Sequence, residues 1–273
     1  MARRALVACV VFAASTLLPI ATATTATASF VTAAHAWSPS SHELIGRQAA
    51  RLAPPDLYRQ LARNRDSYLL GLRDPAQRGT PEGRYQHADG SGRLAVTVHQ
   101  AVDNAVASIR EHRPFNEISY RLGVVAHYLA LANSPLATGS GDATEARWRG
   151  DFARYAESAA PRVRFVFYGF RPGRFDLQRL LDASFRRSRG HYPMLGREYR
   201  RIDFGSGVRG FDDRSTAYAV TSLGYSHAVS DIAETLRYIW LEAGGIDTRP
   251  SIPRRGQAIV RLSPLDATIQ MGR

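Results

Sequence analysis

Apolar residues recur every three or four positions along most of the chain, which is the spacing of helices that bury one face. This pattern predicts short helices between residues 57 and 74 and longer ones over 40–52, 94–112, 117–133, 144–158, 175–187 and 212–242. The segment 117–133 is apolar nearly all round, so we expect it to be the central buried helix. No alternation strong enough for a central sheet appears. The predicted fold class is therefore all-α, with a single multi-helix domain.

Glycine, proline and polar clusters separate the predicted helices. Gly244-Gly245 follow the last one, as glycine commonly does at a helix end. We expect 76–91, which is rich in Gly, Arg and polar residues, to be a loop, and the Pro-rich segment 246–273 to be an extended tail. Residues 205–210 fit the pattern G-x-G-x-x-G, but no strand is predicted before them. They therefore indicate a loop rather than a nucleotide site.

The first 36 residues have the pattern of an export signal. Two arginines near the start precede an apolar stretch, and small residues then lead to Ala34-His35-Ala36, an A-x-A cleavage pattern. The apolar stretch is shorter than the roughly 20 residues of a membrane-spanning helix, which disfavours an N-terminal anchor. We expect cleavage after Ala36, which leaves a helical domain over 37–245 and the tail, in a secreted or periplasmic protein with no transmembrane segment.

The composition limits the chemistry of this mature chain. The only cysteine, Cys9, lies in the predicted export signal, so disulfides are excluded and a metal site must use nitrogen and oxygen ligands. The net charge is +12, and arginine supplies all of the basic residues because the sequence contains no lysine. Arginine forks suit phosphate and carboxylate groups. A basic surface suits anionic lipid or nucleic acid without selecting either, and codon usage in a GC-rich genome explains the arginines equally well.

Three histidines and one aspartate stand where chemistry is conceivable. His42 lies on the first predicted helix, Asp74 where the early helices end, His87 in the polar loop and His127 in the middle of the most apolar helix. Each also has an ordinary interpretation, since a histidine in an apolar helix is most often a core residue bonded to a neighbour. Asp74 precedes a proline and ends a helix, and His87 is in a segment that solvent normally surrounds.

Taken in chain order behind the export signal, these four residues and Trp37 resemble the zinc-dependent phospholipase C and single-strand-specific nuclease superfamily. That group consists of all-helical, exported metallo-phosphoesterases. The resemblance implies that cleavage makes Trp37 the first residue, whose α-amino nitrogen and carbonyl oxygen bind zinc together with His42. It also implies that Asp74, His87 and His127 hold a zinc ion, with Asp74 as the residue on which catalysis depends most. It covers roughly residues 37–136, and the remainder matches only loosely.

The central helix carries the most specific part of the resemblance. The family form Leu-Gly-x-x-x-His-Tyr, followed by Pro-Leu, matches the strings that begin at Leu122, His127 and Pro135. Two positions depart from the family. Leu131 stands where a carboxylate usually bridges two metals, and Ala137 stands where a second histidine is usual. Both departures affect the metals beyond the first, so we expect one zinc ion where the family has up to three.

A later His-x-x-x-Asp pair is also expected from the resemblance. His227 and Asp231 have this spacing, which places both on one helix face, although they occur further along the chain than the usual pair. His99 and Asp103 have the same spacing, so spacing alone does not identify ligands.

The resemblance implies a secreted, metal-dependent phosphoesterase that hydrolyses phospholipid head groups and contacts the membrane surface. Two nitrogens and one oxygen from the ligand set would leave the zinc a fourth position for a water, whose pKa the metal lowers to about 7. A single-strand nuclease stays open as well, since Phe165, Phe167, Tyr168 and Phe170 could stack on bases, although they are more simply core. Two more interpretations remain open: a non-catalytic or single-metal descendant that binds lipid or a partner, and an unrelated exported helical protein.

Overall fold

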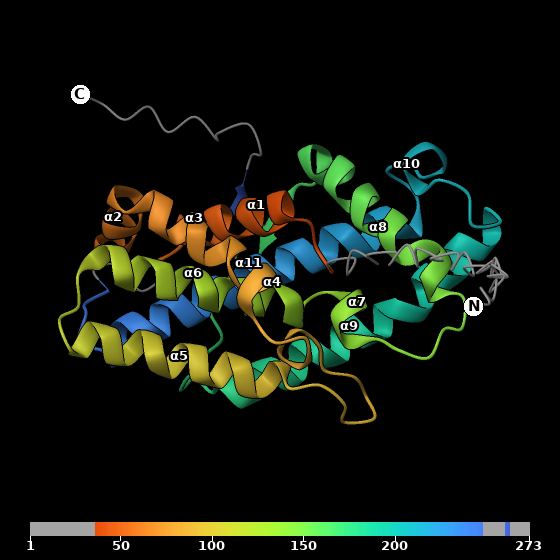
Figure 1. Ribbon diagram of the computed structural model, residues 1–273. Helices are drawn as coiled ribbons and strands as arrows, with labels where there is room; N and C mark the ends of the chain where they lie inside the picture. Colours follow the sequence, from red (N-terminus) through yellow and green to blue (C-terminus); the bar gives the residue numbers. More distant parts are fainter. Residues whose placement is uncertain (1–35, 248–259, 263–273) are drawn as a thin grey trace, which may run out of the picture. The chain divides into compact units, whose positions relative to one another are not determined.

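The computed structural model describes residues 36–247 and the backbone of 260–262, and the all-α prediction is confirmed there (Figure 1). The predicted export signal and most of the predicted tail lie outside the described residues. The longer helices are α1 (Pro39–Ala50), α2 (Pro55–Arg63), α3 (Arg65–Arg73), α5 (Leu94–Arg110), α6 (Phe115–Ala132), α8 (Glu145–Ala159), α9 (Leu177–Arg201) and α11 (Thr216–Glu242). Short helical turns are α4 (Pro75–Arg78), α7 (Pro135–Thr138), α10 (Gly207–Gly210), η1 (Glu82–Arg84) and η2 (Ala160–Arg162).

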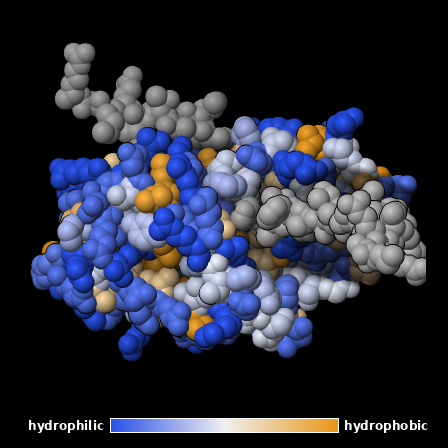
Figure 2. Space-filling view, viewed as in Figure 1, coloured by the Kyte–Doolittle hydropathy of each residue, from blue (hydrophilic) through white to orange (hydrophobic). Residues whose placement is uncertain are grey.

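Helices α6 and α11 form the centre of the fold. Figure 1 shows α1 and α3 on one side of them and α5 and α9 on the other. Residues 125–132 of α6 are all buried, as the apolar sequence of this helix predicted. Hydrophilic residues cover most of the face in Figure 2, with hydrophobic residues in small separate groups. None of the described helices is both long and apolar enough to cross a membrane.

Helices α3 and α6 are in backbone contact, because glycine stands at the crossing on both of them. A Cβ added to Gly71 would fall well inside the contact distance of the Tyr120 carbonyl oxygen, and one added to Gly123 would meet the Tyr68 carbonyl in the same way. The end of α3 is thereby held against α6, which places the Leu72 carbonyl beside His127.

Side-chain caps explain where two of the helices begin. The Ser38 side chain accepts a hydrogen bond from the Ser41 backbone N–H at the start of α1, and Ser215 does the same for Tyr218 at the start of α11. Each cap satisfies one of the backbone donors that the first turn of a helix leaves without an intrahelical partner. Gly244, at φ +91°, follows the end of α11 as predicted.

Helix α9 is longer than predicted. The sequence favoured a helix over 175–187, whereas α9 continues to Arg201 with Pro193 inside it. Proline removes one backbone hydrogen bond of a helix and usually ends or kinks it. Here Tyr192, Leu195 and Tyr199 continue the buried face beyond the proline, while Pro193 itself is exposed. Burial of these side chains therefore outweighs the local cost of the proline.

Two short strands pair outside the helical core. Strand β1 (Phe165–Phe167) pairs antiparallel with β2 (Val260–Leu262), with Phe165 opposite Leu262. Residues 260–262 belong to the segment that was predicted to be extended. Phe165 and Phe167 are buried, so the core interpretation of these two aromatics is the one the structure supports.

Candidate functional site

His42 of α1 and His127 of α6 are brought together, although they are distant in sequence. Their rings stack with centroids 4.1 Å apart and planes 13° from parallel, and both residues are buried. Nδ1 of His127 lies 2.8 Å from the Leu72 carbonyl oxygen. A carbonyl can only accept, so Nδ1 carries the proton, and the lone pair of the neutral ring is on Nε2. This is the way a backbone carbonyl orients a histidine that binds metal through its other nitrogen.

Trp37 is fully buried beside this region. Its indole N–H donates to the Ala130 carbonyl oxygen at 3.0 Å, and its ring packs edge-on against Tyr225 at 5.0 Å between centroids. The carbonyl of the preceding residue, Ala36, accepts a hydrogen bond from the Ser134 hydroxyl at 3.3 Å. The main chain at the predicted cleavage point is therefore packed against the end of α6.

Asp74 joins α3 to α4 and is buried. Its Oδ2 accepts a hydrogen bond from the Tyr120 hydroxyl at 2.9 Å and lies 3.5 Å from the Arg78 guanidinium. Burial, with the hydrogen bond and charge of Asp74 beside it, raises the pKa of the Tyr120 hydroxyl, so Tyr120 remains a donor at neutral pH. The carboxylate is held in one orientation by these partners.

His87 lies in the loop predicted for this part of the chain. Its ring is next to Tyr85, with centroids 4.7 Å apart, and Nδ1 is buried without a hydrogen-bond partner among the described residues. Arg189 of α9 donates to the carbonyl oxygens of Gln86 and His87 at 3.0 and 3.1 Å and so fixes the loop against α9. A buried nitrogen without a partner is what a histidine prepared for another ligand would have.

A cavity of about 470 Å³ lies beside this loop. Its lining includes Ala88, Thr138, Gly139, Arg189, Tyr192 and Arg200. The volume is within the range of small-molecule sites. The guanidinium groups of Arg189 and Arg200 line this cavity together with Asp142, with which Arg200 forms an ion pair.

The fit of the predicted ligands to zinc is incomplete. Within residues 36–247, no three His, Cys, Asp or Glu side chains form a group that could hold a metal ion. The resemblance assigned His42, with Trp37, and His127, with Asp74 and His87, to different metal ions, whereas the structure brings these two histidines into contact. The surroundings of His127 and His87 suit metal ligands individually. The set Asp74, His87 and His127 is not gathered around one point, so we derive no catalytic step through zinc from these side chains.

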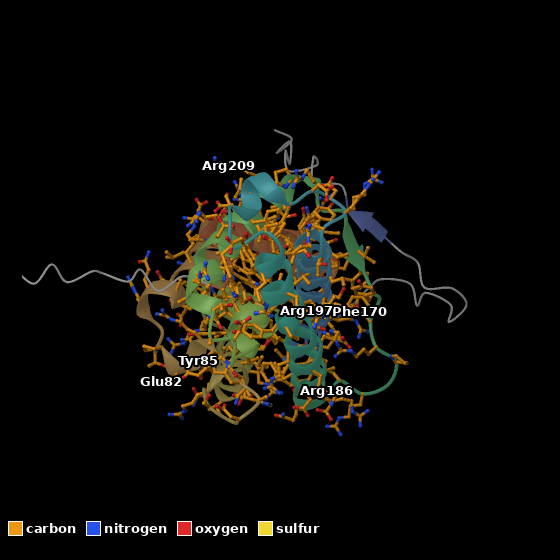
Figure 3. The ribbon with its side chains drawn as sticks, turned by 90° about the vertical axis from the view of Figure 1, so that its right-hand side faces the viewer. Glu82, Tyr85, Phe170, Arg186, Arg197 and Arg209 are labelled. Atoms are coloured by element: carbon orange, nitrogen blue, oxygen red, sulfur yellow. The ribbon has the colours of Figure 1, made fainter. Side chains whose placement is uncertain are left out.

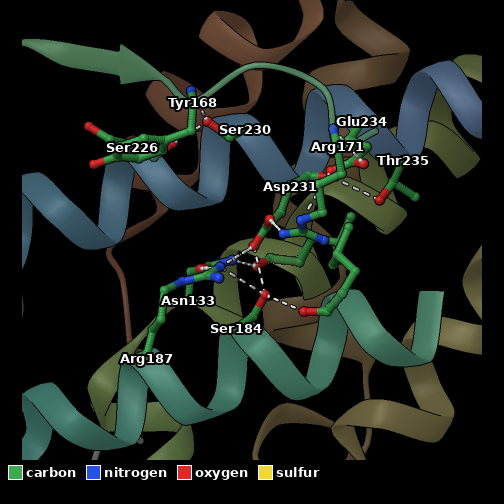
Figure 4. Close-up of polar contacts among 12 residues, drawn as sticks. Asn133, Tyr168, Arg171, Ser184, Arg187, Ser226, Ser230, Asp231, Glu234 and Thr235 are labelled. Carbon is green, nitrogen blue, oxygen red and sulfur yellow. Dashed lines mark hydrogen bonds and ion pairs between the residues drawn. The ribbon is translucent and has the colours of Figure 1, made fainter. Parts of the chain in front are cut away.

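Asp231 is on α11, and its side chain lies in a different environment, facing α9 and the end of α6 (Figure 4). Its Oδ1 accepts from Arg171 at 2.7 Å, and its Oδ2 accepts from Arg187, Ser184 and Asn133 at 2.9, 2.6 and 2.9 Å. The carboxylate side chain is only 2% exposed, so these four donors replace water. We call Asp231 with these four residues the Asp231 cluster.

His227 lies one turn before Asp231 on α11, as the spacing predicted. Its ring stacks on Tyr168, with centroids 4.3 Å apart. Burial, followed by the charge of Arg187, lowers the pKa of His227 from its ordinary value of 6.5 to about 4. The imidazole is therefore neutral at physiological pH. A metal bound by His227 and Asp231 would have to displace the two arginines from the carboxylate.

Leu131 and Ala137 are buried apolar residues of the core. They stand at the two positions where the family that the sequence resembles usually has metal ligands. The string 205–210 contains the short helix α10, and the segment before it, from 202 to 206, contains no strand.

Sequence reasoning missed the residues that hold the predicted ones in place. Tyr120 orients Asp74, Leu72 orients His127 through its backbone, and Arg171 and Arg187 neutralise Asp231. No local signal marks these roles, since each pair is at least 44 positions apart in the chain. The only available hint was that an aspartate in an apolar helix needs a cationic partner.

No family model matches the chain, and no curated protein matches it either.

Proposed function

We propose that this protein is a metal-dependent phosphoesterase that acts on phospholipid head groups, with His42 and His127 at the metal site. The observation that carries the proposal is the buried stack of these two histidines, with Nδ1 of His127 held by the Leu72 carbonyl. Two helices that are distant in sequence deliver two imidazoles to one place, and a backbone group selects the tautomer that metal binding requires.

Other residues of the chain hold the remaining candidate ligands in place. Tyr120 holds the Asp74 carboxylate, and Arg189 holds the loop of His87 beside the cavity of about 470 Å³. The cavity offers Arg189 and Arg200 to a phosphate group, although both already bond to protein acceptors and would share their charge. A zinc ion, when bound, would supply Lewis acidity and a water of lowered pKa.

We propose that the N-terminus supplies a further ligand. In the uncut chain the nitrogen of Trp37 is an amide and cannot bind metal as an amine does. Cleavage after Ala36 would free this amine and release the Ala36 carbonyl from Ser134. We therefore expect the ligand set to be completed only in the processed protein.

The test is metal content. Protein beginning at Trp37 should contain about one zinc per chain by elemental analysis and hydrolyse a phosphodiester lipid, with loss on chelation and recovery on adding zinc. His127→Ala should lose the metal, whereas the control His112→Ala should keep it, because His112 is exposed. Asp74→Asn should remove activity with little change in helix content. A folded, processed protein without bound zinc would overturn the proposal.

A second candidate function is binding without turnover, on the scaffold alone. Leu131 and Ala137 favour it, because both are buried apolar residues where the family uses ligands. This candidate predicts vesicle binding that a chelator does not change and no release of head groups. The same assays with single-stranded DNA and RNA test for nuclease activity.

A further inference from the structure

Helix α9 carries a row of arginines that the fold does not use. Of its seven arginines, Arg187, Arg189, Arg200 and Arg201 bond to Asp231, to loop carbonyls, to Asp142 and to Glu198. The side chains of Arg179, Arg186 and Arg197 are exposed and make no ion pair within the described part of the chain. We call these three residues the arginine row.

In ideal helix geometry the row runs parallel to the helix axis. Residues 179 and 197 are five helical turns apart and share one angular position, and residue 186 falls about 20° from it, since each residue turns the helix by about 100°. At about 1.5 Å per residue, the row is about 27 Å long. Arg186 and Arg197 are labelled along α9 in Figure 3.

An exposed apolar residue and a further arginine follow the end of α9. In the short helix α10, Val208 is 45% exposed, and Arg209 is exposed without an ion pair among the described residues. Arg209 is labelled above α9 at the top of Figure 3. Apolar side chains beside arginine suit the boundary between lipid head groups and acyl chains.

We propose that the arginine row docks the protein on an anionic phospholipid bilayer. A row of arginines on one helix face can place its charges on the same surface at once. The only exposed acidic residue of α9 is Asp182, which lies one turn from both Arg179 and Arg186 and is bonded to Gln178, so arginine outnumbers acid on this face. Each arginine near an anionic bilayer strengthens binding by about fivefold at moderate salt.

A nucleic acid fits the same row less well. Duplex DNA carries one charge per about 1.7 Å of its axis, so about 16 phosphates are distributed around a duplex segment as long as the row of about 27 Å, which offers three arginines. Proteins that bind single strands add aromatic side chains on which bases stack. The exposed residues of α9 include no aromatic residue.

This docking surface goes beyond the proposed function, because it involves no residue of the metal site and requires neither metal nor turnover. The docking proposal and the proposed function can therefore fail independently of each other. A protein without zinc could still bind vesicles through α9, and a zinc enzyme could hydrolyse a soluble phosphodiester without binding vesicles.

Vesicle binding of the mature protein tests the proposal. Sedimentation with phosphatidylcholine vesicles containing 30% phosphatidylglycerol, in a chelator and low salt, should show binding that pure phosphatidylcholine does not. The double variant Arg186→Gln/Arg197→Gln should bind about 25-fold more weakly, from about fivefold per arginine. The matched control Arg63→Gln/Arg65→Gln removes two exposed arginines from α2 and α3 that make no ion pair with the described residues, and it should bind as the unchanged protein does. Circular dichroism establishes that each variant is folded.

Val208→Asn isolates the apolar contribution, and should weaken binding by a few-fold in a way that added salt does not change. Absence of binding to the anionic vesicles by the unchanged protein would overturn the proposal, as would an equal loss in both double variants. Tighter binding to a single-stranded oligonucleotide, dependent on Arg186 and Arg197, would also overturn it and assign the row to nucleic acid.

Discussion

The His42–His127 stack and the Asp231 cluster are both buried polar centres, but their surroundings differ. The Asp231 carboxylate has four donors, two from α9, one from a loop and one from the residue that follows α6, and two of these donors are guanidinium groups. The histidine stack is held by a ring-to-ring contact and by the backbone carbonyl that accepts from His127.

This difference in surroundings distinguishes a carboxylate that forms structural ion pairs from histidines that are candidate metal ligands. A buried carboxylate is stabilised only when donors replace its lost water, and the Asp231 cluster supplies them from the protein. Two buried imidazoles can remain neutral, so they need less compensation, and a neutral ring keeps one nitrogen lone pair. Four experiments test this contrast.

Asp231→Ala should have the largest effect. It leaves Arg171 and Arg187 facing each other without their shared carboxylate, which costs about 3 kcal/mol of unfolding free energy, because both guanidinium groups remain partly solvated. Urea denaturation measures it. Asp231→Asn keeps the shape and should cost less, with unchanged zinc content. Loss of zinc from the folded Asp231→Asn variant would contradict the structural role of Asp231 and identify it as a metal ligand.

Gly71→Ala should destabilise the protein by about 1–3 kcal/mol, because a methyl group there has only the α6 backbone to displace. It should also move the Leu72 carbonyl from His127 and weaken metal binding. The control is Gly150→Ala on α8, where the added Cβ meets only the Arg154 guanidinium at 3.8 Å. That change should be neutral or stabilising by up to about 1 kcal/mol. Equal unfolding curves for the two variants would show that α3 and α6 are not in backbone contact.

Tyr120→Phe removes the hydrogen bond to Asp74 and should cost about 1 kcal/mol in denaturant unfolding. If Asp74 binds metal, zinc affinity should fall by about 10- to 100-fold as its orientation is lost. Tyr218→Phe, which removes a hydroxyl bonded to the Arg162 carbonyl at 2.8 Å, is the matched control for the loss of an oxygen. Unchanged affinity in both would remove Asp74 from the site.

Protonation of His227 should have the smallest effect on stability, because it contributes little at neutral pH. The folded pKa of His227 is about 4, below its ordinary value of 6.5, so the unfolded chain binds this proton first. Stability should therefore fall as the pH drops from 6.5 towards 4 and receive no further contribution from His227 below that range. The slope should be smaller in His227→Gln when thermal unfolding is followed across this range. An unchanged slope would show that His227 does not titrate in this way.

The sequence was sufficient for the fold class and most helix positions, because periodicity reports which face is buried. It failed for the second half of α9, where Pro193 signalled an end that buried Tyr192, Leu195 and Tyr199 override. Local signals contain no information about packing between distant segments.

The candidate site shows the same limit. The order of the residues suggested separate metal ligands in Trp37 with His42 and in Asp74, His87 and His127, whereas the structure places His42 and His127 in contact. The spacing of His227 and Asp231 suggested a metal pair equally well. The arginines that occupy Asp231 come from a loop and from α9, and no spacing rule connects them to α11. Whether any of these residues binds zinc remains a prediction.

The buried Ala36–Trp37 junction constrains the order of events in biogenesis. Ala36 is 6% exposed, and the Trp37 side chain is inaccessible. Helix α1 begins only two residues after Trp37, at Pro39. Because a peptidase binds extended chain at the bond it cuts, we expect the predicted cleavage after Ala36 to take place before Trp37 packs into the core.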